Sequence, residues 1–218
     1  METIKQLTDI LSPLIELITQ LSAIVALWVA IYGIDSWRRE HIGKKRADTA
    51  EEALALLYEA SDAIEQIRHP VSFGGEHGDI ERGEGESEAQ WSARRNANVA
   101  FVRYGQHQEL FNKIHAMRYR FMAQFGKDKA EPLLEVRKVT NEVLAAANTL
   151  SRLWPREHFR TDEQLQKHYD QVEKYEAKFW SMLSEEDELS NRIKAAVEEM
   201  EVTAKSEIEG KGSLYSII

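Results

Sequence analysis

Residues 11–34 read LSPLIELITQLSAIVALWVAIYGI, and residues 35–46 continue as DSWRREHIGKKR. The first run is apolar over the length that a helix needs to cross a bilayer core of roughly 30 Å, at about 1.5 Å per residue. No charged residue occurs between Leu17 and Ile34. We therefore interpret residues 11–34 as a transmembrane helix that follows a short N-terminus, residues 1–10.

The flanks of this segment predict its orientation. Only Lys5 precedes it, whereas several Lys and Arg residues follow it directly, and positive charge gathers on the cytosolic side of a membrane. We expect the N-terminus outside and the rest of the chain in the cytosol. The aromatic and basic residues expected at the membrane interface are Tyr32, Trp37, Arg38, Arg39, Lys44, Lys45 and Arg46.

Two other interpretations of the apolar run stay open. A buried helix of a soluble bundle is also apolar on all sides. A cleaved signal peptide is apolar too, but its positive charge precedes a shorter apolar region, and a small-residue cleavage site follows. Here the basic residues follow the run, so the order of charge favours a membrane span.

Polar and small residues within the span suggest what it does beyond anchoring. Glu16 and Gln20 lie toward the outer end, where a carboxylate reaches the headgroups at less cost than at mid-bilayer. Ser22, Ala26 and Ala30 recur every four residues, and small residues on one face allow two spans to approach closely. This pattern favours self-association. Clustered spans with Glu16 and Gln20 at the outer mouth would instead form a small channel.

The composition of the whole chain favours helices. The 218 residues carry a formal net charge of -9 and include 4 Pro, 11 Gly and no Cys. The lack of Cys excludes disulfides and Cys-based zinc sites. Low Pro and Gly content with abundant Ala, Leu, Glu and Lys is typical of long helices. We predict an all-α protein in which the span precedes a cytosolic antiparallel bundle.

Residues 35–69 combine the basic juxtamembrane segment with the first cytosolic helix. An apolar stripe with heptad spacing predicts a packed face, comprising Ala53, Leu57, Ala60, Ile64 and Ile67. His69-Pro70 ends this helix, because the residue before proline avoids the helical region. Residues 70–88 are rich in Gly and acidic residues and predict an exposed loop. We interpret it as a solvated connector, with docking or metal binding as the alternative.

The remaining helices are expected within residues 89–209, and residues 210–218 form a tail. Capping boxes at Ser87-x-x-Gln90 and Thr161-x-x-Gln164 predict helix starts. One helix is expected from residue 87 to Gly126, a second from about residue 128 to Trp154-Pro155, and a third from residue 161 onward. The Ser184-Glu-Glu-Asp187 stretch is either a new helix start or one polar turn of a continuous helix.

Chemistry-bearing motifs are absent from the sequence. No Gly-rich phosphate loop, His-Glu-x-x-His motif or Glu-x-x-His pair occurs. His107 and His115 lie eight residues apart, and we favour surface positions over metal ligation for them. We therefore expect no catalytic residues, no metal and no cofactor. Basic residues between positions 94 and 138 raise nucleic acid as a ligand, but acidic residues between 173 and 201 offer a simpler partner and the net charge is negative.

The WRREHIGKKR stretch followed by AEEALALLYEASDAIEQIR resembles a group of bacterial membrane-anchored helical proteins. The resemblance covers roughly residues 28–70, the exit of the span and the first cytosolic helix. It contains no catalytic motif and implies only a bacterial inner-membrane setting.

These features together predict a membrane-tethered helical interaction module that self-associates and binds an unidentified protein partner. An oligomeric membrane effector or small channel is the alternative, and an enzyme of unknown type ranks third. Nucleic acid is not expected as a partner.

Overall fold

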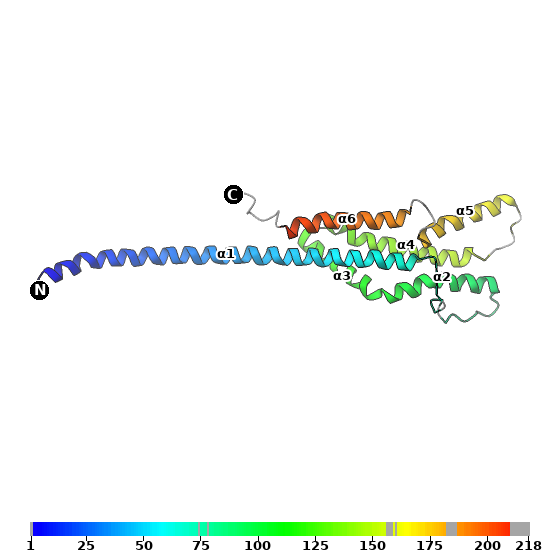
Figure 1. The fold of residues 1–218 in the computed structure, drawn as a ribbon, viewed down its shortest axis with the longest axis horizontal. Helices are drawn as coiled ribbons and strands as arrows, with labels where there is room; N and C mark the ends of the chain where they lie inside the picture. The colour runs from blue at the N-terminus through cyan, green and yellow to red at the C-terminus, as the bar shows by residue number, and fades with distance from the viewer. Residues whose placement is uncertain are drawn as a thin grey trace. The chain divides into compact units, whose positions relative to one another are not determined.

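The computed structural model describes residues 2–73, 75–77, 79–155, 159, 161–181 and 187–209. Within these ranges every regular element is a helix, which confirms the all-α prediction. The elements are α1 (Glu2–Arg68), α2 (Glu88–Gln106), α3 (Gln108–Phe125), the short 3₁₀ helix η1 (Asp128–Ala130), α4 (Glu131–Leu153), α5 (Asp162–Phe179) and α6 (Glu188–Ile208) (Figure 1). The chain divides into two compact units, Met1–Arg46 and Ala47–Ile218.

The first unit is a single helix, the N-terminal part of α1. Among the described residues it contains the one helix segment that is long and apolar enough to cross a membrane. Its large apolar side chains between Leu17 and Trp37 are each more than half exposed, as Ile24 (65%) and Trp28 (66%) illustrate. The predicted apolar run is continuous helix, and from Leu17 onward its apolar side chains face outward.

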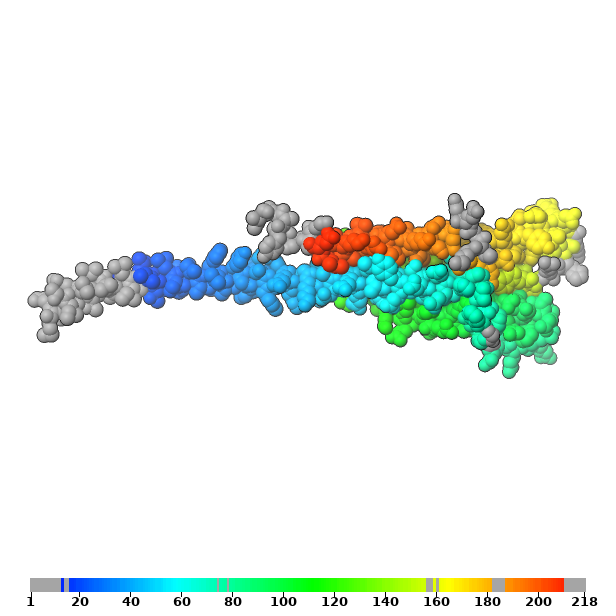
Figure 2. All heavy atoms as spheres, viewed as in Figure 1, coloured from blue at the N-terminus to red at the C-terminus, as the bar shows by residue number. Residues whose placement is uncertain are grey.

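The second unit is a helical bundle in which α4 is the central element. Helix α4 contacts α2, α3, α5 and α6. Figure 2 shows α6 packed along the C-terminal part of α1, and the Tyr58 hydroxyl of α1 donates a hydrogen bond to Glu201 of α6. The heptad stripe of α1 is buried in this core as predicted, with Ala53, Leu57 and Ala60 fully inaccessible to solvent.

Apolar stripes on the other helices complete the core. In α3 the buried residues include Ile114, Met117 and Phe121 at three- and four-residue spacing, which is the period of one helix face. The buried faces of α4 and α6 are also apolar, and they comprise Leu133, Val136, Val139, Val143, Ala147 and Leu150 in α4, and Leu189, Ile193, Val197, Met200 and Ala204 in α6. From α5 only Phe179 is fully buried.

Local signals end several helices where the sequence predicts. The Ser87 side chain accepts a hydrogen bond from the Gln90 amide, and the Gln90 side chain returns one to the Ser87 amide. Thr161 caps α5 by accepting from the Gln164 amide. Gly126 ends α3 with a φ of 93°, a conformation that side chains disfavour. Helix α1 ends at Arg68, directly before His69-Pro70.

The prediction of one helix from residue 87 to Gly126 is wrong, because the structure divides it at His107. The His107 backbone has φ −103° and ψ 9°. Its amide donates to the carbonyl of Tyr104, three residues back, whereas a regular α-helix uses the carbonyl four residues back. Gly105 favours this break, since glycine is among the weakest helix formers. The apolar spacing runs on across the break, and therefore does not reveal it.

The sequence from residue 161 onward forms two helices, so the helix restart is the correct alternative. Helix α5 ends at Phe179, where Trp180 becomes extended. Asp187 starts α6, and its side chain accepts a hydrogen bond from the Ser190 amide. Residues 184–186 of the proposed capping stretch, and the tail at 210–218, lie outside the described residues.

Candidate functional site

Residues 16–34 of α1, here called the apolar segment, carry the predicted self-association and polar positions. Glu16 and Gln20 are one helical turn apart and share a face. Ser22, Ala26 and Ala30 share another face, centred about 100° around the helix from the first, given about 100° per residue. The Ser22 hydroxyl donates back to the Thr19 carbonyl at 2.8 Å, which satisfies it within the helix.

The predicted interface residues form the C-terminal end of the same unit. Tyr32 stacks on Trp28 at a ring-centroid distance of 5.7 Å, and Trp37 stacks on His41 at 5.5 Å. The side chains of Arg38, Arg39, Lys44 and Lys45 are exposed, and that of Arg46 is half-buried. An apolar stretch thus ends in an aromatic pair and then in cations, the order found where a helix leaves a bilayer.

Arg68, which the sequence analysis does not single out, is a buried structural residue of the bundle. Its guanidinium is 1% exposed and donates to the carbonyls of Ala177, Lys178 and Trp180, which lie at the end of α5. It also donates to Asp187 at 2.9 Å. Burial raises the pKa of Asp187, but hydrogen bonds from the Ser190 amide and from Arg68 outweigh it, so the pKa lies below its usual value.

Arg103 is a second buried arginine, and it holds the loop at 69–77 by hydrogen bonds. Its guanidinium is buried and donates to the carbonyls of His69 and Val71, each at 2.7 Å, and to both carboxylate oxygens of Glu76. The hydrogen bonds from Arg103 hold the pKa of Glu76 below its usual range. An arginine on an otherwise apolar helix face is the signal that would identify both residues, since a buried charge requires partners.

The acidic loop at 70–88 is also tied to α2. The Trp91 indole donates to the Ile80 carbonyl at 2.9 Å. Arg94 donates to the Glu81 carbonyl and to Glu86, and hydrogen bonds from Arg94 and from the Gly83 amide lower the pKa of Glu86 to about 2. The described residues of this loop therefore pack on the helix that follows them, which makes it more than a solvated connector.

The ion pairs between helices differ from the predicted ones. We predicted that basic residues between 94 and 138 pair with acidic residues between 173 and 201. Instead, their carboxylate partners belong to the loop, to α1 and to their own helices, in the pairs Arg94–Glu86, Arg103–Glu76, Lys113–Glu109, Arg120–Glu52 and Lys138–Glu131.

Ion pairs do connect α4 to the C-terminal helices, but the acidic residues belong to α4 and the basic residues to α5 and α6. Arg192 of α6 bridges Glu135 and Glu142 of α4 at 2.7 and 2.8 Å, and Lys178 of α5 also reaches Glu142. Burial raises the pKa of both glutamates, but hydrogen bonds from cations outweigh it and both pKa values are lowered. The cations are Arg192 and Lys138 at Glu135, and Lys178 and Arg192 at Glu142. The sequence could not reveal this pairing, because it depends on which helix faces meet.

The two histidines weighed as metal ligands contact different neighbours. His107 Nε2 lies 3.1 Å from the side-chain oxygen of Gln66, and His115 Nδ1 lies 3.5 Å from Arg137. No group of three or more His, Asp or Glu side chains in the described ranges is placed to hold a metal ion.

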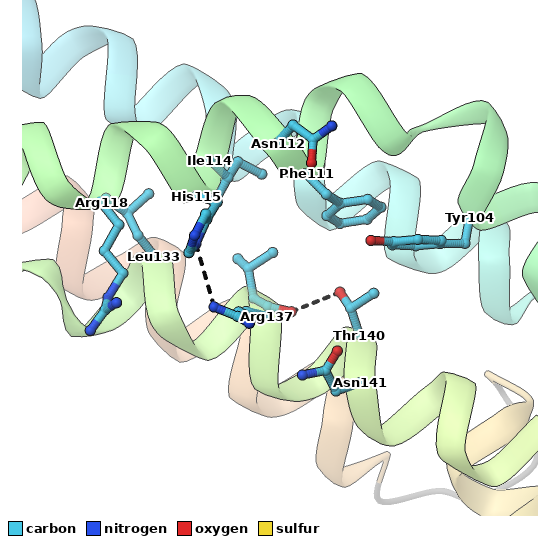
Figure 3. Close-up of a pocket in the computed structure, with 11 residues that line it drawn as sticks. Tyr104, Phe111, Asn112, Ile114, His115, Arg118, Leu133, Arg137, Thr140 and Asn141 are labelled. Carbon is cyan, nitrogen blue, oxygen red and sulfur yellow. Dashed lines mark hydrogen bonds between the residues drawn. The ribbon is translucent and has the colours of Figure 1, made fainter.

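A pocket of about 240 Å³ opens between α3 and α4, with the end of α2 beside it (Figure 3). Its apolar wall is formed by Tyr104, Phe111, Ile114, Leu133 and Val136. Tyr104 stacks on Phe111 at 5.1 Å across the break at His107, so the division of the predicted helix shapes this wall.

The other lining residues of the pocket are polar. They are Asn112, His115, Arg118, Arg137, Thr140 and Asn141. The Thr140 hydroxyl is satisfied by the Val136 carbonyl at 2.7 Å. The sequence analysis gave no indication of this pocket, because its residues come from three helices whose contacts only the fold defines.

Comparisons of the chain with protein families, with curated proteins and with solved structures find no match.

Proposed function

We propose that this chain is a membrane-tethered helical interaction module, with the apolar segment as a transmembrane anchor and the bundle in the cytosol. The observation that carries the proposal is a continuous helix whose apolar side chains, from Leu17 to Ile34, are all exposed. Water penalises such a surface by about 25 cal/mol for each Å² of apolar area, whereas lipid does not. A soluble bundle would bury these side chains, so their exposure supports the membrane interpretation.

The orientation within this proposal rests on charge. Four exposed cations, Arg38, Arg39, Lys44 and Lys45, follow the aromatic pair at one end of the segment. Because such clusters are retained in the cytosol, we propose that residues 1–10 lie outside a bacterial inner membrane and that Ala47–Ile218 lie on its cytosolic side. Reporter enzymes fused after residue 218 test this topology. A cytosolic reporter should be active and a periplasmic one silent, and the reverse result would overturn the orientation.

We further propose that the module self-associates through the face of Ser22, Ala26 and Ala30. All three side chains are short and exposed, so two helix backbones can approach there and gain dispersion contacts. The test uses residues 1–46 in a membrane dimerisation reporter. Ala26→Leu should lower the signal, while Val25→Leu, a neighbour on another face, should leave it unchanged. Equal signals from all three sequences would remove this face as the cause of association.

The second candidate function is an oligomeric membrane effector or small channel. It is favoured by Glu16 and Gln20, which share a face separate from that of the small residues. Helices that associate through the small-residue face would leave this polar pair free to line an opening. Ion flux from the purified protein in liposomes distinguishes the two functions. The interaction module predicts no flux, and the channel predicts flux that Glu16→Gln changes in ion selectivity.

A further inference from the structure

The pocket between α3 and α4 is divided into a cationic end and an apolar end. Figure 3 shows Arg118 and His115 toward one end of the view, Tyr104 and Phe111 toward the other, and Arg137 between them. Ile114, Leu133 and Val136, each at most 2% exposed, form the buried part of the wall. A ligand that joins one charged group to an apolar body matches this division.

The two arginines that line the pocket differ from Arg120, which lies two residues after Arg118 on α3. Arg120 is paired with Glu52 at 2.7 Å. In the part of the chain that the structure describes, neither Arg118 nor Arg137 has a carboxylate partner. Arg118 lies over the Tyr119 ring at 5.6 Å, and Arg137 reaches only His115. Both guanidinium groups are therefore available to an external anion.

His115 reinforces this arrangement. Arg137 is always a donor, so its contact at 3.5 Å makes His115 Nδ1 the acceptor. The tautomer that accepts at Nδ1 carries its proton on Nε2, which becomes a further donor. Asn112 and Asn141 on the rim add amide groups. The polar end thus presents donors to a ligand and offers no carboxylate that would repel an anion.

We propose that this pocket binds a small soluble organic acid. The acid group would lie at Arg118 and Arg137, whose planar guanidinium groups match the geometry of a carboxylate or phosphate. The apolar body would lie against Tyr104 and Phe111. The volume of about 240 Å³ is below that of pockets for drug-sized ligands, about 300–1,000 Å³, and this limits the ligand to one ring or a short chain.

The test uses the full chain reconstituted in phosphatidylcholine nanodiscs. Binding of each probe is measured by isothermal titration calorimetry. The probes are phenylacetate, its neutral isostere phenylacetamide, and inorganic phosphate. Phenylacetate should bind, phenylacetamide should bind at least about tenfold more weakly because it lacks the charged hydrogen bonds, and phosphate should bind more weakly because it lacks the apolar body. Equal binding of the acid and the amide, or no binding of the acid, would overturn the proposal.

Variants locate the binding. Arg118→Gln combined with Arg137→Gln should lower the phenylacetate affinity at least about tenfold. Asn141→Trp, which places bulk at the rim without a change of charge, should do the same. Arg152→Gln is the matched control, because this arginine is exposed and lies on α4 away from the pocket, and it should leave the affinity unchanged. Unfolding curves must agree among the variants, and an equal affinity loss in Arg152→Gln would overturn the assignment.

A lipid headgroup is the competing source of an acid group. Replacing part of the phosphatidylcholine by phosphatidylglycerol distinguishes it from a soluble acid. Unchanged phenylacetate affinity supports the soluble ligand. Displacement of phenylacetate by phosphatidylglycerol would overturn it in favour of a headgroup.

Discussion

Two stretches of α1, residues 17–34 and 50–67, differ in the exposure of their apolar side chains. In the first stretch apolar residues occur on every side and are exposed, as at Leu27 (64%) and Ile34 (65%). In the second most of them form one stripe, which is buried, while residues such as Glu51 and Glu59 face solvent. The backbone is helical in both, so the difference lies in the pattern of the sequence alone.

This difference teaches that the periodicity of apolar residues indicates the surroundings of a helix as well as its existence. A stripe with a period near 3.6 residues fits a helix with protein on one side and water on the other. Apolar residues on all sides fit a helix surrounded by an apolar medium. The proposed membrane anchor assigns lipid to the exposed stretch, and the following predictions test the two surroundings in turn.

The largest effect is expected from charge placed in the exposed stretch. Arginine at mid-bilayer costs about 2.5–3.5 kcal/mol, so Val25→Arg with Val29→Arg should cost about 5–7 kcal/mol of insertion free energy. The doubly substituted chain should leave the carbonate-washed membrane fraction, whereas Val25→Leu with Val29→Leu should remain in it. Equal retention of both proteins would mean that lipid does not surround this stretch.

In the bundle, a large effect is expected when a buried side chain is shortened. Phe121 is 0% exposed, and Phe121→Ala should lower the free energy of unfolding by about 3–5 kcal/mol, through lost burial and a cavity. Urea unfolding followed by near-UV circular dichroism measures this change. Tyr119→Ala is the matched control on the same helix, since Tyr119 is 55% exposed and should have little effect. Comparable losses in the two variants would place Phe121 outside the core.

Substitution of a buried arginine should lower the free energy of unfolding more than substitution of an exposed one. Arg68→Gln removes the guanidinium that donates to three carbonyls and is the charged partner of Asp187. We expect a loss of about 2–4 kcal/mol in the same urea experiment. Arg82→Gln breaks a pair with Glu88 in which both side chains are at least half exposed, and should cost under about 1 kcal/mol. A small effect at Arg68 would show that water replaces the guanidinium at this position.

The features that the sequence predicts correctly are those decided by neighbouring residues. They are the caps at Ser87 and Thr161, the stop at His69-Pro70 and the buried stripe of α1, which depend on contacts within a few residues or on period alone. These rules suffice to predict the fold class and most helix bounds.

The features that the sequence does not predict depend on contacts between distant segments. Arg68 donates hydrogen bonds to residues more than 100 positions away. Arg192 pairs with Glu135 and Glu142 because α6 lies on α4. The break at His107 is hidden by apolar spacing that continues through it. The pocket exists only because that break and the α3–α4 contact bring Tyr104, Arg118 and Arg137 together.

The smallest effect is expected at the surface of the loop, where Glu86 titrates. Its carboxylate accepts hydrogen bonds from Arg94 at 2.7 Å and from the Gly83 amide at 2.8 Å, and its pKa falls from the usual 4.5 to about 2. Because the folded pKa is depressed, this carboxylate stabilises the loop above about pH 4.5, and the contribution is lost as the pH falls through about 2. The Gly83 amide reports the titration directly, since it donates to the group that titrates.

A nuclear magnetic resonance titration of the full chain in detergent micelles should therefore show the Gly83 amide shift changing with a midpoint near pH 2. In Arg94→Gln the midpoint should rise toward 4.5, because the charged donor that favours the ionised form is gone. Arg95→Gln is the matched control, since Arg95 lies over the Trp91 ring at 4.6 Å and is not a donor to Glu86, and its midpoint should stay near that of the unmodified chain. A midpoint near 4.5 in the unmodified chain would mean that Arg94 does not hold Glu86, and that the loop is the solvated connector predicted from its composition.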